Sequence, residues 1–417
     1  MKKLIILALA AILALNAAAA LADPIEIDGI TPRNILIRNA GLNPPADEMI
    51  ARGISPTTGR KLDQITCPEG FAGVAVTKTY QPMMVQISNT SNGIGVKEDG
   101  SLYAFAPVNG SYADVVYEAC QVKGGGETRM SMIFSDTIPN YAGFLRSTRL
   151  THVRIRQEWD CVFCTSGYST ADVPKEWTKM GVRVYGDGKS PGIVYLGDAG
   201  INKPWKKYVR RLKGVKGPNN EVFELANILR EVVPADHVPA NHTWKFTDER
   251  PAGGDSAEII YVTFGSEYVT DSRLEYDEDE NAYIRYVKVK KQPDQPYRES
   301  VLQNPEDIEG LVNGNRTLQV RFDKQVTGNT IMFNNVIVQG INMKWRGGSR
   351  PDPVLTGSGN ADYFMGGKHI AGVWARDDFN SRTVFYGPDG NEIEMQRGRT
   401  LIILMGYNDK NSRVSYE

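Results

Sequence analysis

Apolar residues in this chain recur mainly in short runs or in alternation with polar residues, a spacing that predicts β-strands. The clearest pair of runs lies at residues 115–117 and 130–134, on either side of the glycine triplet at 124–126. Both runs are rich in β-formers, and consecutive glycines favour a turn. We therefore expect a β-hairpin here, with Glu118 and Arg129 close to each other.

A further strand is expected from Gln81 to Asn89, and the second half of the chain is almost entirely strand-like. Its expected strands are residues 259–264, 283–289, 317–322, 336–338, 382–386 and 401–405. Short turns between several of them, such as the Gly-Pro-Asp-Gly run at 387–390, predict antiparallel pairing. Residues 346–362 are rich in turn-forming residues and are expected to be a mobile insertion.

Helical patterns are few. Residues 150–164 are expected to form a helix that runs into a strand. From Asn220, a suitable N-cap, apolar residues at 222, 225, 226, 229, 232 and 233 repeat at helical spacing, which predicts an amphipathic helix packed on the core. The many strands and few helices indicate an α+β fold.

The N-terminus has the pattern of a Sec-type signal peptide. Lys2 and Lys3 precede the apolar run LIILALAAILAL, and Ala20-Leu21-Ala22 is a small-x-small cleavage site. We expect residues 1–22 to be removed after Ala22, leaving a protein exported to the periplasm, the extracellular space or the cell envelope. Retention of this segment as a membrane anchor is the alternative. No later run approaches the roughly 20 apolar residues of a spanning helix. Residues 23–80 are expected to be an irregular extension.

Charge is nearly balanced along the chain. The formal net charge is −1, and loss of the two leader lysines would change it to −3. This balance argues against a dedicated nucleic-acid binder, which usually carries a basic excess. The basic stretch from Lys203 to Lys216 suits either an anionic-polymer patch or a solvated face, and the overall balance favours the solvated face.

Four cysteines, an even number in a chain expected to be exported, make disulfides plausible, with three possible connectivities. They are Cys67, Cys120, Cys161 and Cys164. The last two have the spacing of a redox dithiol but lack an evident helix after them. A zinc site is a weaker alternative, because the second CxxC pair is missing.

No metal or other cofactor is expected. His237 and His242 are separated by five residues, which fits neither a helix face nor a strand face. The acidic run 277–281 resembles the start of a calcium loop, but Ala282 stands where a glycine is required. This run is better interpreted as the tip of a hairpin. Nucleotide-binding and hydrolase fingerprints are also missing.

Several motifs together resemble the YerB-like bacterial envelope lipoproteins. They are ADVVYE at 113–118, Thr128-Arg129, Gly143, Arg146-Ser147, Arg149, the strand at 81–89, Tyr283-Ile284-Arg285 and the segments 335–339 and 367–400. The resemblance implies a β-rich, layered ββα sandwich with mostly antiparallel sheets, formed by an N-terminal region (81–255) and a C-terminal region (256–417). It implies no defined activity.

This sequence departs from the family in several places, of which two bear on function. No cysteine stands at the cleavage site to carry a lipid, so lipoprotein status is not expected. Relatives show His-x-Gly where this chain has Thr165-Ser166-Gly167, which weakens the idea of a general base there.

These observations favour a non-enzymatic protein that binds an anionic envelope glycan, peptide or protein partner. The expected ligand-binding residues are Glu118, Thr128, Arg129, Arg146, Ser147 and Arg149. Pairing of the arginines with Glu118 or Asp114 inside the fold is the structural alternative. The enzymatic alternative is a cell-wall hydrolase that uses carboxylates such as Glu118 and Asp277.

Overall fold

The structure is a computed structural model in which β-strands predominate and helices are few, so the expected β-rich α+β fold is confirmed. It describes residues 43–65, 74–75, 79–90, 95–96, 102–103, 107–124, 127–181, 193–196, 207–212, 220–233, 237, 239–240, 243–265, 271–289, 298–301, 312, 330–408 and 412–417. The expected leader at 1–22 and the expected strand at 317–322 lie outside these residues.

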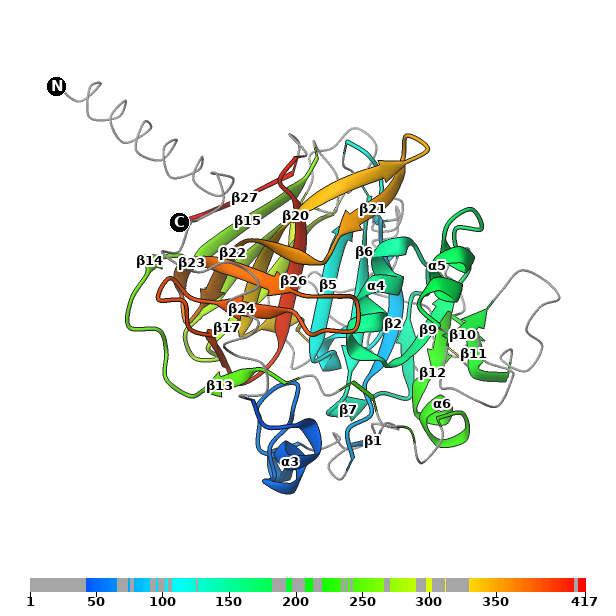
Figure 1. Ribbon diagram of the computed structural model, residues 1–417, viewed down its shortest axis with the longest axis horizontal. Helices are drawn as coiled ribbons and strands as arrows, with labels where there is room; N and C mark the ends of the chain where they lie inside the picture. Colours follow the sequence, from blue (N-terminus) through cyan, green and yellow to red (C-terminus); the bar gives the residue numbers. More distant parts are fainter. Residues whose placement is uncertain are drawn as a thin grey trace.

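A mixed, 12-stranded sheet crosses the molecule (Figure 1). From one edge to the other its main path is β10 (Ile193–Leu196), β9 (Val162–Ser166), β2 (Met83–Thr90), β6 (Glu127–Phe134), β5 (Val115–Cys120), β26 (Thr400–Gly406), β20 (Asn335–Arg346), β22 (Gly357–Met365), β23 (Lys368–Arg376) and β14 (Asp255–Ser256). Two further strands, β21 (Arg350–Val354) and β24 (Val384–Tyr386), pair with β20 and β23.

Strand β26 joins the two halves of the chain. It runs parallel to β5 on one side and to β20 on the other, so that Leu401 lies opposite both Val116 and Val336. Every residue of β26 is buried. The last long strand is therefore a central one, and the sheet is completed only when both halves have come together.

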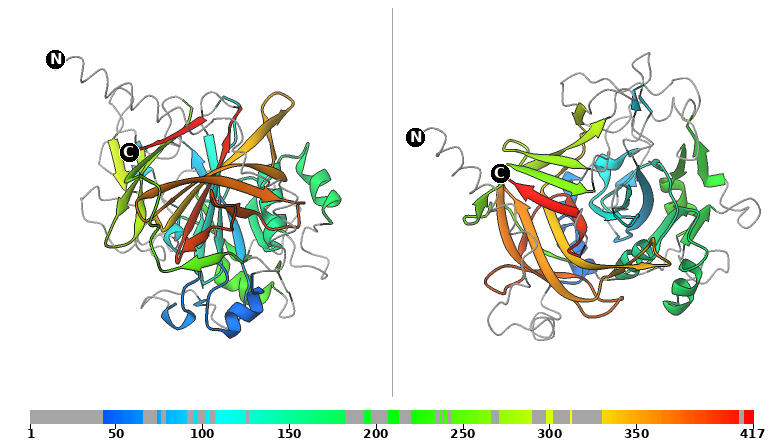
Figure 2. Two further views of the ribbon diagram at one scale, coloured as in Figure 1. Left: turned by 60° about the vertical axis from the view of Figure 1, so that its left-hand side comes forward. Right: turned by 90° about the horizontal axis from the view of Figure 1, so that it is seen from above.

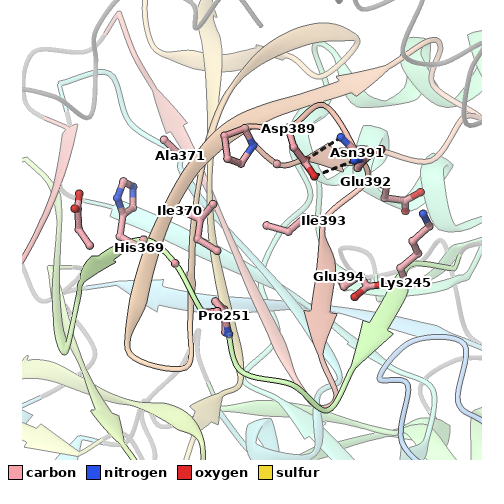
Figure 3. A pocket seen from close by; sticks show the side chains of 16 residues that line it. Lys245, Pro251, His369, Ile370, Ala371, Asp389, Asn391, Glu392, Ile393 and Glu394 are labelled. Carbon is pink, nitrogen blue, oxygen red and sulfur yellow. Dashed lines mark hydrogen bonds between the residues drawn. The ribbon is translucent and has the colours of Figure 1, made fainter.

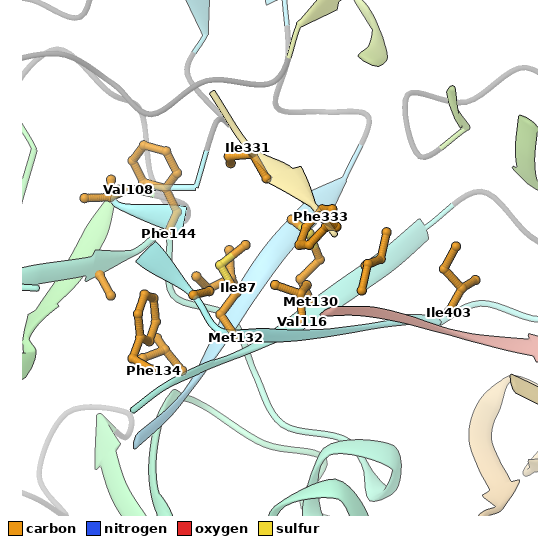
Figure 4. Packing of buried hydrophobic residues seen from close by; sticks show 14 of the residues in the cluster. Ile87, Val108, Val116, Met130, Met132, Phe134, Phe144, Ile331, Phe333 and Ile403 are labelled. Atoms are coloured by element: carbon orange, nitrogen blue, oxygen red, sulfur yellow. The ribbon is translucent and has the colours of Figure 1, made fainter. Parts of the chain in front are cut away.

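A six-stranded sheet packs on one face of the central sheet. Its strands are β18 (Arg298–Val301), β17 (Ala282–Val289), β16 (Ser272–Asp277), β15 (Ile259–Phe264), β27 (Ser412–Tyr416) and, paired with β17, β19 (Met332–Phe333). Alternate residues of the central strands, among them Ile87, Val116 and Met130, share one buried cluster with residues of this second sheet such as Phe333 (Figure 4). Because successive side chains of a strand point to opposite faces, one face of the β5–β6 hairpin lies between the two sheets.

Helices cover part of the other face. Helix α4 (Leu150–Trp159) and helix α5 (Val173–Lys179) lie beside β2 and β9 (Figure 1). Val153 and Trp159 pack in a second buried cluster with Tyr117 and Ile133 of the hairpin. The molecule thus has the expected ββα layering, and the helix running into a strand at 150–164 is confirmed.

Smaller elements surround these layers (Figure 2). They are α3 (Ala46–Ala51), α6 (Leu225–Glu231), the 3-10 turns Leu62–Gln64 and Gly110–Tyr112, the pairs β1 (Val74–Ala75) with β7 (Thr137–Ile138), β3 (Gly95–Val96) with β4 (Leu102–Tyr103) and β13 (Lys245–Thr247) with β25 (Glu394–Gln396), and the sheet β11 (Val209–Arg211), β12 (Glu221–Glu224), β8 (Tyr141–Gly143).

Two local expectations were wrong. The helix expected from Asn220 begins only at Leu225, because residues 221–224 form β12 and pair with β8 and β11. Pairing with two neighbouring strands thus overrides the helical spacing of the apolar residues at these positions. Residues 346–362 are not a loop-like insertion, since β21 pairs with β20 and β22 pairs with β20 and β23.

Residues 43–65 of the N-terminal extension dock on both halves of the chain. The hydroxyls of Ser55 and Thr58 donate to the buried carboxylate of Asp136, each at 2.5 Å. Thr58 also accepts a backbone hydrogen bond from Gly398 at 2.8 Å. Gly59 has φ +66°, and a Cβ there would lie 2.2 Å from Phe246, so only glycine fits.

Among the described helices, none combines the length and the apolar character needed to cross a membrane.

Candidate anion-binding site

The hairpin β5–β6 divides the predicted ligand-binding residues between the two faces of the central sheet. Its register places Glu118 opposite Met130 and Arg129 opposite Ala119. Met130 packs between the two sheets, whereas Ala119 packs on the helical side. Because neighbouring residues of a strand point to opposite faces, Glu118 and Arg129 are on opposite sides of the sheet.

Glu118 is a structural residue. Its carboxylate is fully buried and lies 2.7 Å from Arg285 Nη2 of β17. The other carboxylate oxygen accepts hydrogen bonds from Asn89 Nδ2 and Thr128 Oγ1, both at 2.7 Å. The prediction that the side chains of Glu118 and Arg129 lie close together is therefore wrong. Thr128 belongs to the buried hydrogen-bond network around Glu118.

Three arginines gather on the helical face. Arg129 comes from β6, while Arg146 and Arg149 come from the segment between β8 and α4. That segment is held between two strands: Arg146 N donates to Gln86 O of β2 at 2.9 Å, and Ser166 N of β9 donates to Arg146 O at 3.4 Å. The backbone of the central sheet thus fixes the position of the cluster.

The arginine cluster, defined as Arg129, Arg146 and Arg149, has little internal compensation. Arg129 is 4% exposed and lies 3.1 Å from the Glu127 carboxylate, and it also donates to the Ser147 carbonyl. Arg149 donates to the Thr148 carbonyl at 3.0 Å. Among the described residues, Glu127 is the one carboxylate that pairs with the cluster. Three guanidinium groups therefore share one negative charge.

Unpartnered donors mark the same place. The Nε atoms of Arg129 and Arg146 are buried and have no hydrogen-bond partner among the described residues. Burial and the repulsion by Arg149 together lower the pKa of Arg129 to about 9. Burial also lowers the pKa of Arg149. Buried cations without acceptors are costly, and a bound anion would relieve that cost.

His152 belongs to the site, although the sequence did not reveal it. Its Nδ1 accepts a hydrogen bond from the Arg149 backbone N–H at 3.0 Å, so the ring proton is on Nε2. That Nε2 is buried without a partner in the described chain. Burial, followed by the charges of Arg129 and Arg149, holds the pKa of His152 well below its usual range. The sequence signal for His152 was its position three residues after Arg149, at the start of a predicted helix.

Ser147 and Thr165 shape the backbone around the cluster. Ser147 contributes its carbonyl to Arg129, and a Cβ on Gly167 would lie 2.6 Å from the Ser147 hydroxyl. The Thr165 hydroxyl donates to the Arg146 carbonyl at 2.9 Å and lies 2.7 Å from the Thr148 hydroxyl. Thr165 thus holds the backbone of Arg146 in position.

Other candidates do not form a site within the described residues. No group of three His, Cys, Asp or Glu side chains there is suited to a metal ion. His237 lies against the Asp160 carbonyl at 3.2 Å, and His242 is outside the described residues. In the basic stretch, Lys207 pairs with Glu231 at 2.7 Å, and Arg210 and Arg211 pair with Glu224 and Glu221. These pairs agree with a solvated face.

The CxxC pair, Cys161 and Cys164, is unsuited to redox chemistry. Cys120, Cys161 and Cys164 are buried and form no disulfide, Cys120 donates to the Val122 carbonyl at 3.0 Å, and Cys67 is outside the described residues. Cys161 packs on the helical side of the central sheet and Cys164 on the side of the second sheet. An odd separation along a strand directs two side chains to opposite faces, so this pair does not face each other.

Comparison with known proteins agrees with this architecture. Residues 71–233 match the N-terminal domain, and residues 315–402 the C-terminal domain, of a protein family of unknown function, DUF3048. The chain belongs to this family. The structure is also similar to the crystal structure of YerB from Bacillus subtilis, which is 18% identical, with a TM-score of 0.58. That similarity covers 87% of this chain and 99% of YerB, which confirms the resemblance found in the sequence. Comparison with curated proteins gives no match.

Proposed function

We propose that this DUF3048 protein is an exported protein of the cell envelope that binds an anionic group of a glycan, peptide or protein partner. The binding residues are Arg129, Arg146 and Arg149, with His152 as a neutral neighbour. The leader-like sequence of residues 1–22 supports export, and the balanced charge of the chain supports a local rather than a global attraction for anions.

One observation carries the proposal: within the described part of the chain, three arginines share a single carboxylate. Buried arginines in proteins are normally compensated by acids. Here Arg129 is almost fully buried, yet its Nε has no acceptor and its only ionic partner in the described chain is Glu127. An architectural cluster would not require this excess of positive charge.

The chemistry of the cluster indicates which groups would bind. Arginine side chains are donors only, and the geometry of His152 leaves its ring with a donor at Nε2. A suitable ligand group therefore accepts hydrogen bonds and is ionised, as phosphate and carboxylate are. Guanidinium groups bind both by paired hydrogen bonds.

The carboxylates nominated for hydrolysis are unsuited to that role. Glu118 is fully buried and ion-paired with Arg285, so it is closed to substrate. Asp277 accepts hydrogen bonds from the backbone N–H groups of Asp279 and Glu280 at the tip of the β16–β17 hairpin. This local role of Asp277 agrees with a turn residue.

The test is a calorimetric titration of the purified protein with muropeptides and, separately, with anionic wall polymers. We expect saturable binding that weakens with added salt, because exposed charge interactions are screened. Arg146→Ala should lower the affinity about tenfold, the effect of removing one charge-assisted contact, without changing the melting temperature. Release of a cleaved product would favour an enzyme instead.

Arg413→Ala is the matched control. Arg413 is an exposed arginine on β27, away from the cluster, and its loss should leave the affinity unchanged. Equal affinities of wild type and Arg146→Ala would refute the proposed site. A large loss of stability in Arg146→Ala would instead assign Arg146 to the architecture of the fold.

A further inference from the structure

A groove of about 860 Å³ lies far from the arginine cluster, at the opposite end of the central sheet. It is bounded by strand β23, the segment before β14 and the hairpin that follows β24. Its volume is in the range of sites that hold a substantial ligand. Figure 3 shows Ile370 and Ile393 in the middle of the groove, with Pro251 and the Asp389 hairpin on either side.

The edge of β23 is partly open inside the groove. β14 pairs with this edge only at Lys368 and His369, and β24 pairs with it only at residues 373–375. No described strand pairs with residues 370–372 on that side. A short free strand edge offers backbone donors and acceptors to an extended segment.

Charge distinguishes the groove from a simple apolar patch. Asp255, Asp389 and Glu394 line it, and none of these carboxylates has an ion-pair partner among the described residues. Two hydrogen bonds from Asn391 lower the pKa of Asp389, so this group is ionised at neutral pH. Among the described residues that line the groove, Lys245 is the one lysine or arginine. The surface is therefore acidic around an apolar floor.

Glu392, also at the groove, is already compensated. It accepts two hydrogen bonds from Arg382, at 2.7 and 2.9 Å, and one from Asn43 at 2.9 Å. His369 is engaged as well, 2.8 Å from the Asp362 carboxylate. Three uncompensated carboxylates against one ammonium leave a net negative charge for a ligand to balance.

We propose that this groove docks an extended peptide segment of a partner protein, with apolar residues flanked by lysine or arginine. The apolar side chains would pack on Ile370 and Ile393, the cationic ones would reach Asp255, Asp389 or Glu394, and the backbone would bond the open edge of β23. Charge complementarity selects this occupant over an anionic one. The groove and the arginine cluster thus attract opposite charges.

A suitable probe is a fluorescein-labelled peptide with the sequence TPRNILIRNA, taken from residues 31–40 of this chain. It carries the required chemistry, with two arginines around an apolar core. The measurement is fluorescence anisotropy with the full-length protein at low and at moderate salt. We expect saturable binding that weakens with salt, and none for a peptide with both arginines replaced by glutamate.

Variants of the protein locate the binding. Glu394→Lys should weaken binding about tenfold, as should Asp255→Lys, because each reverses a charge on an exposed rim residue. Glu280→Lys, an exposed residue of the β16–β17 turn, is the matched control and should bind like wild type. Arg146→Ala should also bind normally, which keeps this result separate from the arginine cluster.

Three outcomes would overturn the proposal. The first is the absence of saturable binding, and the second is equal binding of the charge-reversed peptide. The third is evidence that this chain's own residues 31–40 occupy the groove. These residues precede Asn43, whose side chain donates to Glu392 at the groove. If the full-length Arg33→Glu, Arg38→Glu variant binds the probe tenfold more tightly than wild type, the occupant is this chain's own segment rather than a partner.

Discussion

Glu118 of β5 and Arg285 of β17 form a 2.7 Å ion pair that joins the central sheet to the six-stranded sheet, and both side chains are fully buried. Glu118 also accepts hydrogen bonds from Asn89 and Thr128. A buried pair of this kind is stable because each charge compensates the other, so removal of one partner costs more than the pair itself contributes.

We expect Glu118→Gln to lower the free energy of unfolding by about 3–5 kcal/mol, because it leaves the Arg285 charge buried and uncompensated. The double variant Glu118→Leu, Arg285→Met should recover most of this loss. Urea denaturation measures both. The control is Glu278→Gln, which removes the exposed 3.3 Å pair with Arg250 and should cost less than about 1 kcal/mol. Equal losses in the single and double variants would contradict the prediction.

Asp114 should make stability depend on pH. Burial raises its pKa to about 8, and repulsion by Asp136 acts in the same direction, although the backbone N–H groups of Ser135 and Asp136 bond its carboxylate. The native protein therefore keeps a proton that the unfolded chain loses above about pH 4. The free energy of unfolding should fall as pH rises from about 4 to about 8, by at most about 1.4 kcal/mol per pH unit.

Denaturation with urea at several pH values tests this dependence. Asp114→Asn should flatten the profile, because the amide does not titrate. Asp279→Asn, an exposed residue of the β16–β17 turn, should leave the profile of the wild type. A stability that rises between pH 5 and pH 8 in the wild type would show that Asp114 is ionised in the fold.

The sequence predicted the architecture better than the site. Local patterns were sufficient for the β5–β6 hairpin, for helix α4 and for the β16–β17 turn. The resemblance supplied the layered arrangement. The sequence could not show which residues of the hairpin face the second sheet and which face the helices, because the contacting residues are far away in the chain. The partner of Glu118 is 167 residues away in the chain, in a Tyr-x-Arg motif that indicated a strand but not a contact.

The same limit applies to the arginine cluster and to the groove. Arg129, Arg146 and Arg149 were identified as a group because they are close in the sequence. His152 and Glu127, which set the charge and the hydrogen bonding of the cluster, were not. The groove depends on strand edges and on a hairpin whose members pair across the sheet. No short motif records that arrangement.

The buried thiols should be unreactive in the native protein. Burial raises the pKa of Cys161 to about 12 and that of Cys164 well above its usual range. The thiolate is the reactive form, so native Cys161 and Cys164 should not react with Ellman's reagent until the protein unfolds in urea. Comparison with Cys161→Ala and Cys164→Ala assigns the signals. Rapid labelling of Cys161 in the native protein would contradict this prediction and support a redox role.

Removing the single carboxylate of the arginine cluster should strengthen anion binding. Glu127 lies 3.1 Å from Arg129 and is partly exposed, so a bound anion competes with it for the guanidinium. Glu127→Gln keeps the size of the side chain and removes the competing charge. We expect a three- to tenfold gain in affinity for the anionic ligand, in the range of one charge-assisted contact. Glu275→Gln, which removes the carboxylate paired with Arg273 on the second sheet, should have no effect. If Glu127→Gln binds more weakly than wild type, the carboxylate orients Arg129 for the ligand rather than competing with it.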